Sequence, residues 1–210
     1  MILSSSFSIY FHAFFPRVPV WHWAVIGGVA LVLAVLLRVR RRVSVPGTVM
    51  FGLAVLMGLF LLDALALIRM GSRWVGDSGL DLVAELRRVM SGNEEILFLM
   101  LFNAGVFVPF GLFLSGFFLA TGKGRWRSLW MATLAGLGLS LLIESIQLVF
   151  HIGIFELTDL LLNTFGTFVG AALPLGGRFL DAILLNFFYG GWYNGLIFFV
   201  TFGSEMKFYY

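Results

Sequence analysis

The sequence predicts an all-α membrane protein, a polytopic transmembrane bundle of five to six helices. Hydrophobic residues make up 60% of the 210 residues, and charged residues make up only 12%. That charged fraction is about half the roughly 25% found in soluble domains. Apolar runs near the ~20 residues that a spanning helix needs recur along the chain, and most charges lie between these runs. We therefore do not expect a water-soluble fold.

Apolar segments follow one another along the chain, separated by polar or basic residues. They cover residues 20–37, 49–68, 96–120, 129–150, 158–175 and 180–202. The last segment contains Asp181, Asn186 and Asn194, so it is expected either to cross the membrane or to lie at its surface as an interfacial helix. Residues 71–95 alternate charged and apolar side chains, which predicts a short amphipathic helix on the outer surface.

These segments predict three parts of the chain. Residues 1–48 form an N-terminal transmembrane helix and a basic cytoplasmic loop, residues 49–177 form a four-helix membrane core, and residues 178–210 form the C-terminal apolar segment. The densest basic clusters are at 38–42 and 123–127. Because basic loops favour the cytoplasmic side, the N-terminus is predicted to lie outside.

Composition also narrows the function classes. The formal net charge of +3 comes mainly from Arg clusters beside apolar runs, which is typical of membrane topology rather than of a nucleic-acid-binding surface. The absence of Cys excludes disulfides, thiolate metal sites and cysteine nucleophiles. No cofactor motif is present, and the carboxylates alone are a weak signal for a metal, so we predict neither.

A polar constellation lies on the fourth segment, where Ser140, Glu144 and Gln147 are spaced four and three residues apart. This spacing places them on one face of a helix. Glu144 lies roughly 9 Å inside the outer end of its segment at the helical rise per residue. Because an isolated charge is costly in lipid, Glu144 is expected to be protonated, paired, or turned toward a hydrated cavity.

Neighbouring segments carry polar residues at a similar predicted depth. They are Asn103 on the third segment, and Asp159 and Asn163 on the fifth. With Ser140, Glu144 and Gln147, they predict a ligand-binding polar cavity open to the outer face. The alternative is that all six form only interhelical hydrogen bonds of about 1 kcal/mol each. Asp159 has a further alternative role as a helix cap.

Other residues favour structural roles. Pro109 and Gly111 interrupt the third segment, and the Gly166 and Gly170 spacing lets helix backbones approach closely. Asp63 is the only charge inside the second segment, and we expect either a structural pairing with Arg69 or a function. His22 lies between two Trp residues, which is typical of an aromatic belt at the membrane interface rather than of a metal site.

Three motifs resemble the VanZ-like family of small bacterial membrane proteins, named for a component of teicoplanin resistance. The segment from Asn103 through Pro109 to Gly111 resembles the family's Asn-x5-Pro-x-Gly helix. Ile143-Glu144-Ser-Ile-Gln147 resembles its Ile-Glu-x-x-Gln helix.

The third motif is the most specific. Asp159, Asn163, Thr164, Gly166 and Gly170 resemble the family's Asp-x3-Asn-Thr-x-Gly-x3-Gly signature in order and spacing. The resemblance covers roughly residues 50–175. It implies a bacterial plasma membrane location and a contribution to glycopeptide tolerance, without supplying a reaction.

Three functions remain open from the sequence. The first is a non-enzymatic envelope protein, with membrane lipids around it, whose outer cavity binds a lipid headgroup, a cell-wall precursor or a lipoglycopeptide. The second is an intramembrane enzyme that uses Glu144 and Asp159 on a lipid-linked substrate. The third is a structural subunit that binds a membrane partner protein through the Gly166 and Gly170 face.

Overall fold

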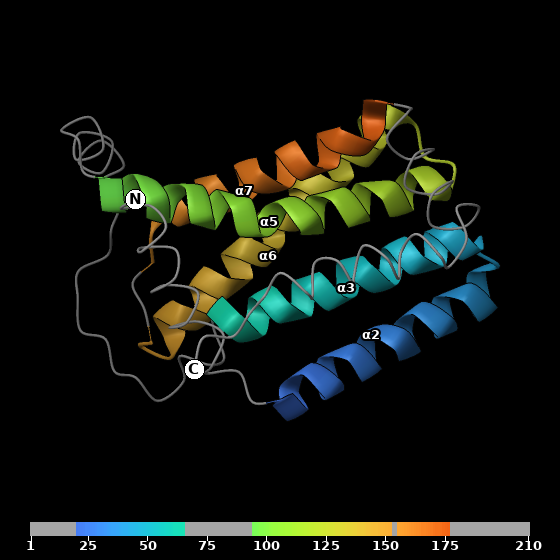
Figure 1. Cartoon of the computed structure of the whole chain (residues 1–210), viewed down its shortest axis with the longest axis horizontal. Helices are drawn as coiled ribbons and strands as arrows, with labels where there is room; N and C mark the ends of the chain where they lie inside the picture. The colour runs from blue at the N-terminus through green and yellow to red at the C-terminus, as the bar shows by residue number, and fades with distance from the viewer. Residues whose placement is uncertain (1–19, 66–93, 153–154, 177–210) are drawn as a thin grey trace, which may run out of the picture. The chain divides into compact units, whose positions relative to one another are not determined.

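The described residues form helices, as the sequence predicted. The computed structural model describes residues 20–65, 94–152 and 155–176, and within these ranges it contains five α-helices and no strand. They are α2 (Val20–Arg41), α3 (Val45–Leu65), α5 (Glu94–Ala120), α6 (Arg125–Val149) and α7 (Leu157–Ala172), followed by the 3-10 helix η3 (Leu173–Gly176) (Figure 1). Four of them, α2, α3, α5 and α6, are long and apolar enough to cross a membrane. The prediction of an all-α, polytopic membrane bundle is confirmed.

Several helices extend beyond the predicted apolar segments. α6 begins at Arg125 rather than at residue 129, and α2 continues to Arg41 rather than ending at residue 37. Arg residues end the stretch that lipid tails can cover, but they are good helix formers, so the backbone continues as a helix into the headgroup layer. Glu94 and Glu95, the last two residues of the amphipathic helix predicted over 71–95, are the first two residues of α5. The rest of the predicted amphipathic helix and the segment 180–202 lie outside the described residues.

α7 differs most from the sequence prediction of a single span over 158–175. It has 16 residues, or about 24 Å of α-helix, against a hydrocarbon layer of ~30 Å. The chain then continues as η3, in which Pro174 is buried. Pro174 has no backbone N–H and cannot donate to the Gly170 carbonyl four residues earlier, and that carbonyl instead accepts the Leu173 N–H in a tighter turn. α7 packs against both α5 and α6.

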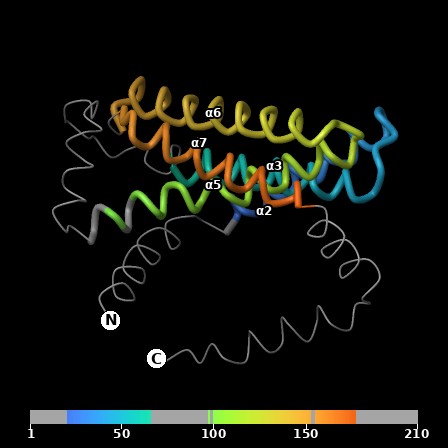
Figure 2. Tube along the Cα trace, turned by 90° about the horizontal axis from the view of Figure 1, so that it is seen from above, coloured from blue at the N-terminus to red at the C-terminus, as the bar shows by residue number. Residues whose placement is uncertain are grey.

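The long helices alternate in direction. Figure 1 shows α2 and α5 running one way and α3 and α6 running the other, and Figure 2 shows α7 lying along both α5 and α6. α7 runs parallel to α5, because α6 carries the chain back between them. The turn from α5 to α6 is a Schellman motif, in which Gly122 has φ 81° and the Lys123 N–H donates to the Phe118 carbonyl at 3.0 Å.

The described charges separate between the two ends of these helices. The Lys and Arg side chains that the structure describes all lie at one end, here called the basic end: Arg38, Arg40, Arg41, Arg42, Lys123, Arg125 and Arg127. The described acidic side chains all lie at the other, here called the acidic end: Asp63, Glu144, Glu156 and Asp159. The two clusters that the sequence assigned to one side of the membrane therefore share one end of the bundle.

α5 and α7 approach each other at the level of their backbones. A Cβ atom added at Gly166 would overlap the carbonyl of Ala104, and one added at Gly170 would overlap the carbonyl of Val108. Gly111 on α5 fits against the backbone of Thr167 in the same way. Since helix interfaces in membranes depend on close van der Waals packing, these glycines set the register of the two helices.

This packing makes a testable prediction. Gly166→Ala should destabilise the fold by about 1–3 kcal/mol, because the new methyl group meets a backbone carbonyl that no side-chain rotation can move. The matched control is Gly105→Ala on α5, where a Cβ meets nothing within 4 Å. The control should leave stability unchanged or raise it by up to ~1 kcal/mol. Detergent-induced unfolding of the purified chain measures both, and equal effects of the two substitutions would contradict this packing.

Candidate functional site

The most buried carboxylate of the acidic end is held by the start of α7. Glu144 is 2% exposed, and its Oε2 accepts a hydrogen bond from the backbone N–H of Glu156 at 3.0 Å. Glu156 is the N-cap of α7, and its side chain makes no capping hydrogen bond. Glu144 therefore accepts the N-cap amide from a neighbouring helix, a contact that the N3 side chain makes in a capping box, near the positive end of the helix dipole. This contact explains how a carboxylate is accommodated at such a depth.

The turn after α6 brings these two residues together. His151 has φ 51°, and the Ile152 N–H donates to the Gln147 carbonyl at 3.0 Å, which forms a second Schellman motif. Ile152 is buried as a result. This turn reverses the chain direction and brings it back toward α6. The backbone amide of Glu156 therefore reaches the carboxylate of Glu144, which lies 12 residues earlier in the sequence.

Gln147 connects α6 to α3. Its Nε2 donates to the backbone carbonyl of Leu65, the last residue of α3, at 2.8 Å. In lipid no water is at hand to pair a buried amide, and the Leu65 carbonyl supplies a protein partner to the buried Gln147 side chain.

Asn163 and Ser140 join α7 to α6 within the buried part of the bundle. The Asn163 Nδ2 donates to the Ser140 Oγ at 2.9 Å, and the Asn163 backbone carbonyl accepts from the Thr167 hydroxyl at 2.9 Å. The Asn163 Oδ1 is buried and has no hydrogen-bond partner within the described part of the chain.

Asn103 and Asp159 form the more accessible part of the site. The Asn103 Nδ2 donates to the Asp159 Oδ1 at 2.6 Å, and this contact between α5 and α7 is partly buried. Asp159 lies in the first turn of α7 rather than at its N-cap position, which Glu156 occupies. The helix dipole still favours a negative charge in the first turn.

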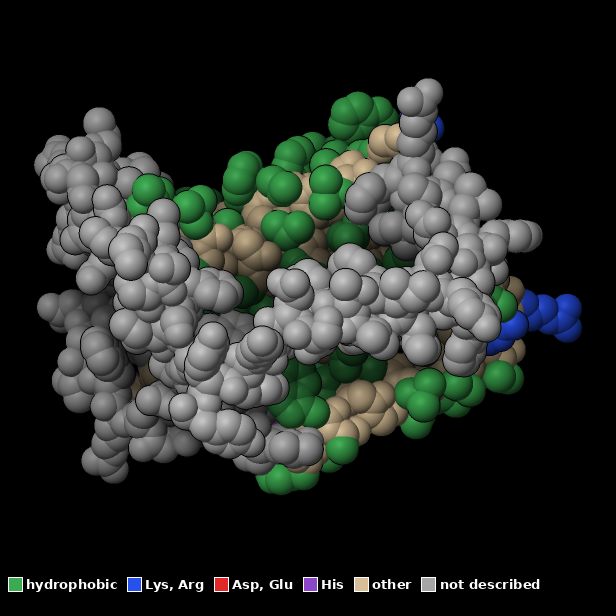
Figure 3. Space-filling model, viewed as in Figure 1, with side chains coloured by type: hydrophobic (Ala, Val, Ile, Leu, Met, Phe, Trp, Pro, Cys, Tyr) green, Lys and Arg blue, Asp and Glu red, His purple; other side chains and the backbone are tan. Residues whose placement is uncertain are grey.

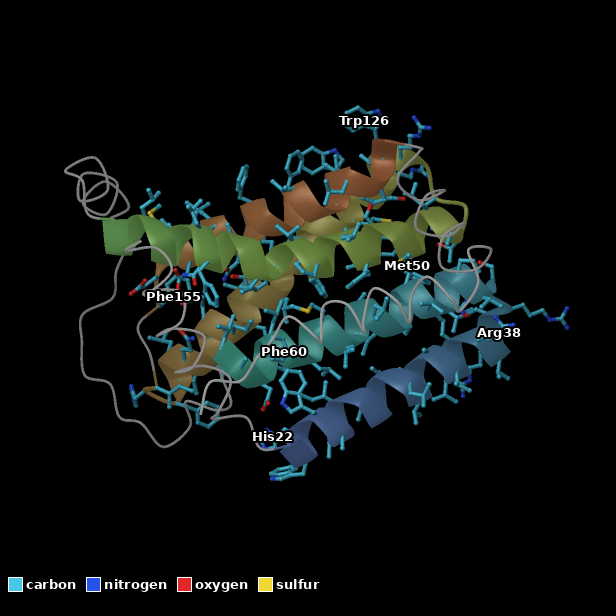
Figure 4. All side chains as sticks on the ribbon, in the orientation of Figure 1. His22, Arg38, Met50, Phe60, Trp126 and Phe155 are labelled. Atoms are coloured by element: carbon cyan, nitrogen blue, oxygen red, sulfur yellow. The ribbon has the colours of Figure 1, made fainter. Side chains whose placement is uncertain are left out.

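The predicted site residues thus lie at the acidic end, where hydrogen bonds join α3, α5, α6 and α7. Figure 4 places the labelled Phe155, in the connection before α7, beside polar side chains at this end. The described residues include no group of three His, Asp or Glu side chains placed to hold a metal ion. Of these polar residues, the partly exposed Asp159 and Asn103 are the ones placed for hydrogen bonding with an external polar group.

A second polar contact at the acidic end was missed by the sequence analysis. The His22 Nδ1 lies 3.0 Å from the Asp63 Oδ2, so His22 is a partner of Asp63 and not only a member of an aromatic belt. The predicted partner Arg69 lies outside the described residues. Beside this pair, Trp23 of α2 stacks on Phe60 of α3 with ring centroids 4.9 Å apart. The sequence does contain a signal for this contact, namely similar depth in the membrane. His22 is near the start of α2 and Asp63 is near the end of the antiparallel α3, so both residues lie near the same end of the two helices.

The pair makes a second prediction. Asp63→Leu or His22→Leu alone should each destabilise the α2–α3 contact by about 1–3 kcal/mol, because each leaves a polar group without its partner. The double substitution should cost less than the sum by about 1–2 kcal/mol. Detergent-induced unfolding of the four proteins in a double-mutant cycle measures this coupling. Additive single effects would show that the two side chains do not interact.

The comparisons identify one family. A family model described as VanZ/LLP1 matches residues 54–180, which is more than half of the 210-residue chain. The matched range begins within α3 and includes α5, α6 and α7, so it contains the whole polar site and excludes α2. No curated protein and no solved structure matches the chain.

Proposed function

Since the chain belongs to the VanZ/LLP1 family, we propose that it is a non-enzymatic protein of the bacterial plasma membrane that contributes to glycopeptide tolerance by binding a polar group at its acidic end. In this proposal the basic end faces the cytoplasm and the acidic end faces outward, as the positive-inside rule favours. The ligand is a lipid headgroup, a cell-wall precursor or a lipoglycopeptide.

The observation that carries the proposal is that the polar residues of the acidic end differ in burial and in hydrogen-bond partner. Asp159 and Asn103 are partly exposed and bonded to each other at 2.6 Å, whereas Glu144 is buried against the backbone of α7. A carboxylate and an amide carbonyl accept hydrogen bonds, so they favour ligands that carry hydroxyl, amide or ammonium donors. All three ligand classes carry such groups.

Burial favours binding over acid or base catalysis by Glu144. A general acid or base must come within hydrogen-bond reach of the proton that it transfers. Glu144 is 2% exposed and already accepts the Glu156 amide, which is the geometry of a group that positions α7. In our proposal Glu144 holds the start of α7, and thereby Asp159, in place.

The test is tolerance to teicoplanin in a susceptible host. The parent chain should raise tolerance above that of the empty host, and Asp159→Asn should return it to the host level because the accepting charge is lost. Glu144→Gln should also abolish tolerance, because a neutral amide accepts the Glu156 N–H more weakly than a carboxylate does and so holds the start of α7, and with it Asp159, less firmly. Both variants keep side-chain volume and can still accept one hydrogen bond, so their abundance in the membrane should stay normal.

Ser145→Ala is the matched control. Ser145 lies beside Glu144 on α6, and its hydroxyl only donates to the Leu141 carbonyl of the same helix at 2.6 Å. This variant should retain the parent's tolerance. A parent chain that confers no tolerance would contradict the proposed function. Full tolerance in both carboxylate variants at normal abundance would instead leave a purely structural role for the acidic end.

A further inference from the structure

The basic end carries a concentration of exposed positive charge. Its Arg and Lys side chains come from three places, namely the end of α2, the turn after α5 and the start of α6, and all of them are exposed. Figure 3 shows blue side chains projecting from this end. None of the acidic side chains that the structure describes lies there. The positive charge of the basic end is therefore not neutralised by the acidic side chains that the structure describes.

Exposed Trp side chains mark the depth of this charge in the membrane. Trp126 is 73% exposed and Trp130 is 54% exposed, and they lie one turn apart at the start of α6. Trp prefers the boundary between lipid tails and water. Arg125 and Arg127 flank Trp126, so their guanidinium groups lie at the level of the lipid headgroups rather than far out in water.

We propose that the basic end is a docking surface for anionic phospholipid headgroups in the leaflet that it faces. Guanidinium groups bind phosphate through paired hydrogen bonds, and a net negative headgroup adds attraction that a zwitterionic one lacks. The charges are spread over three chain segments on an exposed surface, which matches a layer of headgroups better than one small ion. Three of its seven described basic residues, Arg38, Arg40 and Arg41, lie on α2, which the family match does not include.

The test uses Trp fluorescence quenched by brominated lipids in nanodiscs. The chain has six Trp residues, so one reporter protein keeps only Trp126 and a second keeps only Trp21, with Phe at the other positions. Trp21 is 64% exposed at the acidic end and is the internal control. Both leaflets of a nanodisc have the same composition, so the result does not depend on orientation.

Brominated phosphatidylglycerol should quench Trp126 several-fold more effectively than brominated phosphatidylcholine, and should quench Trp21 equally well with both lipids. Attraction of about 1 kcal/mol per basic residue corresponds to roughly a fivefold preference per charge before salt screening. Adding Lys123→Gln, Arg125→Gln and Arg127→Gln to the Trp126 reporter should reduce the preference toward one. Arg125→Lys with Arg127→Lys should retain most of it, because the charges remain.

Other results would overturn the proposal. Equal quenching of Trp126 by the two lipids, or a preference that survives the triple Gln substitution in a protein with unchanged helix content, would show that the basic end does not select anionic lipids. Competition with millimolar inorganic phosphate distinguishes a surface that binds lipid headgroups from one that binds free phosphate. Loss of the preference in phosphate, but not in chloride of equal ionic strength, would assign the surface to a free anion.

Discussion

The backbone contact between α5 and α7 is the constraint on which the rest of this bundle depends. Gly166 and Gly170 leave no room for a side chain between the helices, so only one register lets the two backbones meet. In that register Asn103 meets Asp159, and Ser115 donates to the carbonyl of Ala171, each pair separated by 56 residues. The glycines therefore place the accessible polar pair.

The lipid environment explains why so many of the remaining polar residues bond to backbone groups. Water is absent from the hydrocarbon layer, so amides and carbonyls at helix ends need protein partners. Glu144 accepts the N-cap amide of Glu156 before α7, and Gln147 donates to the carbonyl of Leu65 on α3. These two residues join α7 and α3 to α6, and the more exposed Asp159 and Asn103 bond to each other.

The sequence predicted the features that follow from composition and periodicity. Apolar runs predicted the helices, and the spacing of Ser140, Glu144 and Gln147 predicted one polar face on α6. The partners were not predictable in this way, because the Glu156 amide that binds Glu144 carries no side-chain signal. Asp159 was open to an N-cap role because helix starts are hard to place within a few residues, and the bond between His22 and Asp63 depends on how two helices lie side by side.

The most direct test of this account is the register of α5 against α7 in the native membrane. The chain has no Cys, so cysteines introduced at positions 103 and 159 can be joined with a short bifunctional thiol reagent without background. Because Asn103 and Asp159 are in contact, this pair should cross-link rapidly. A pair at 103 and 163, one turn further along α7, should react much more slowly. Faster cross-linking of the second pair would contradict the register and the site built on it.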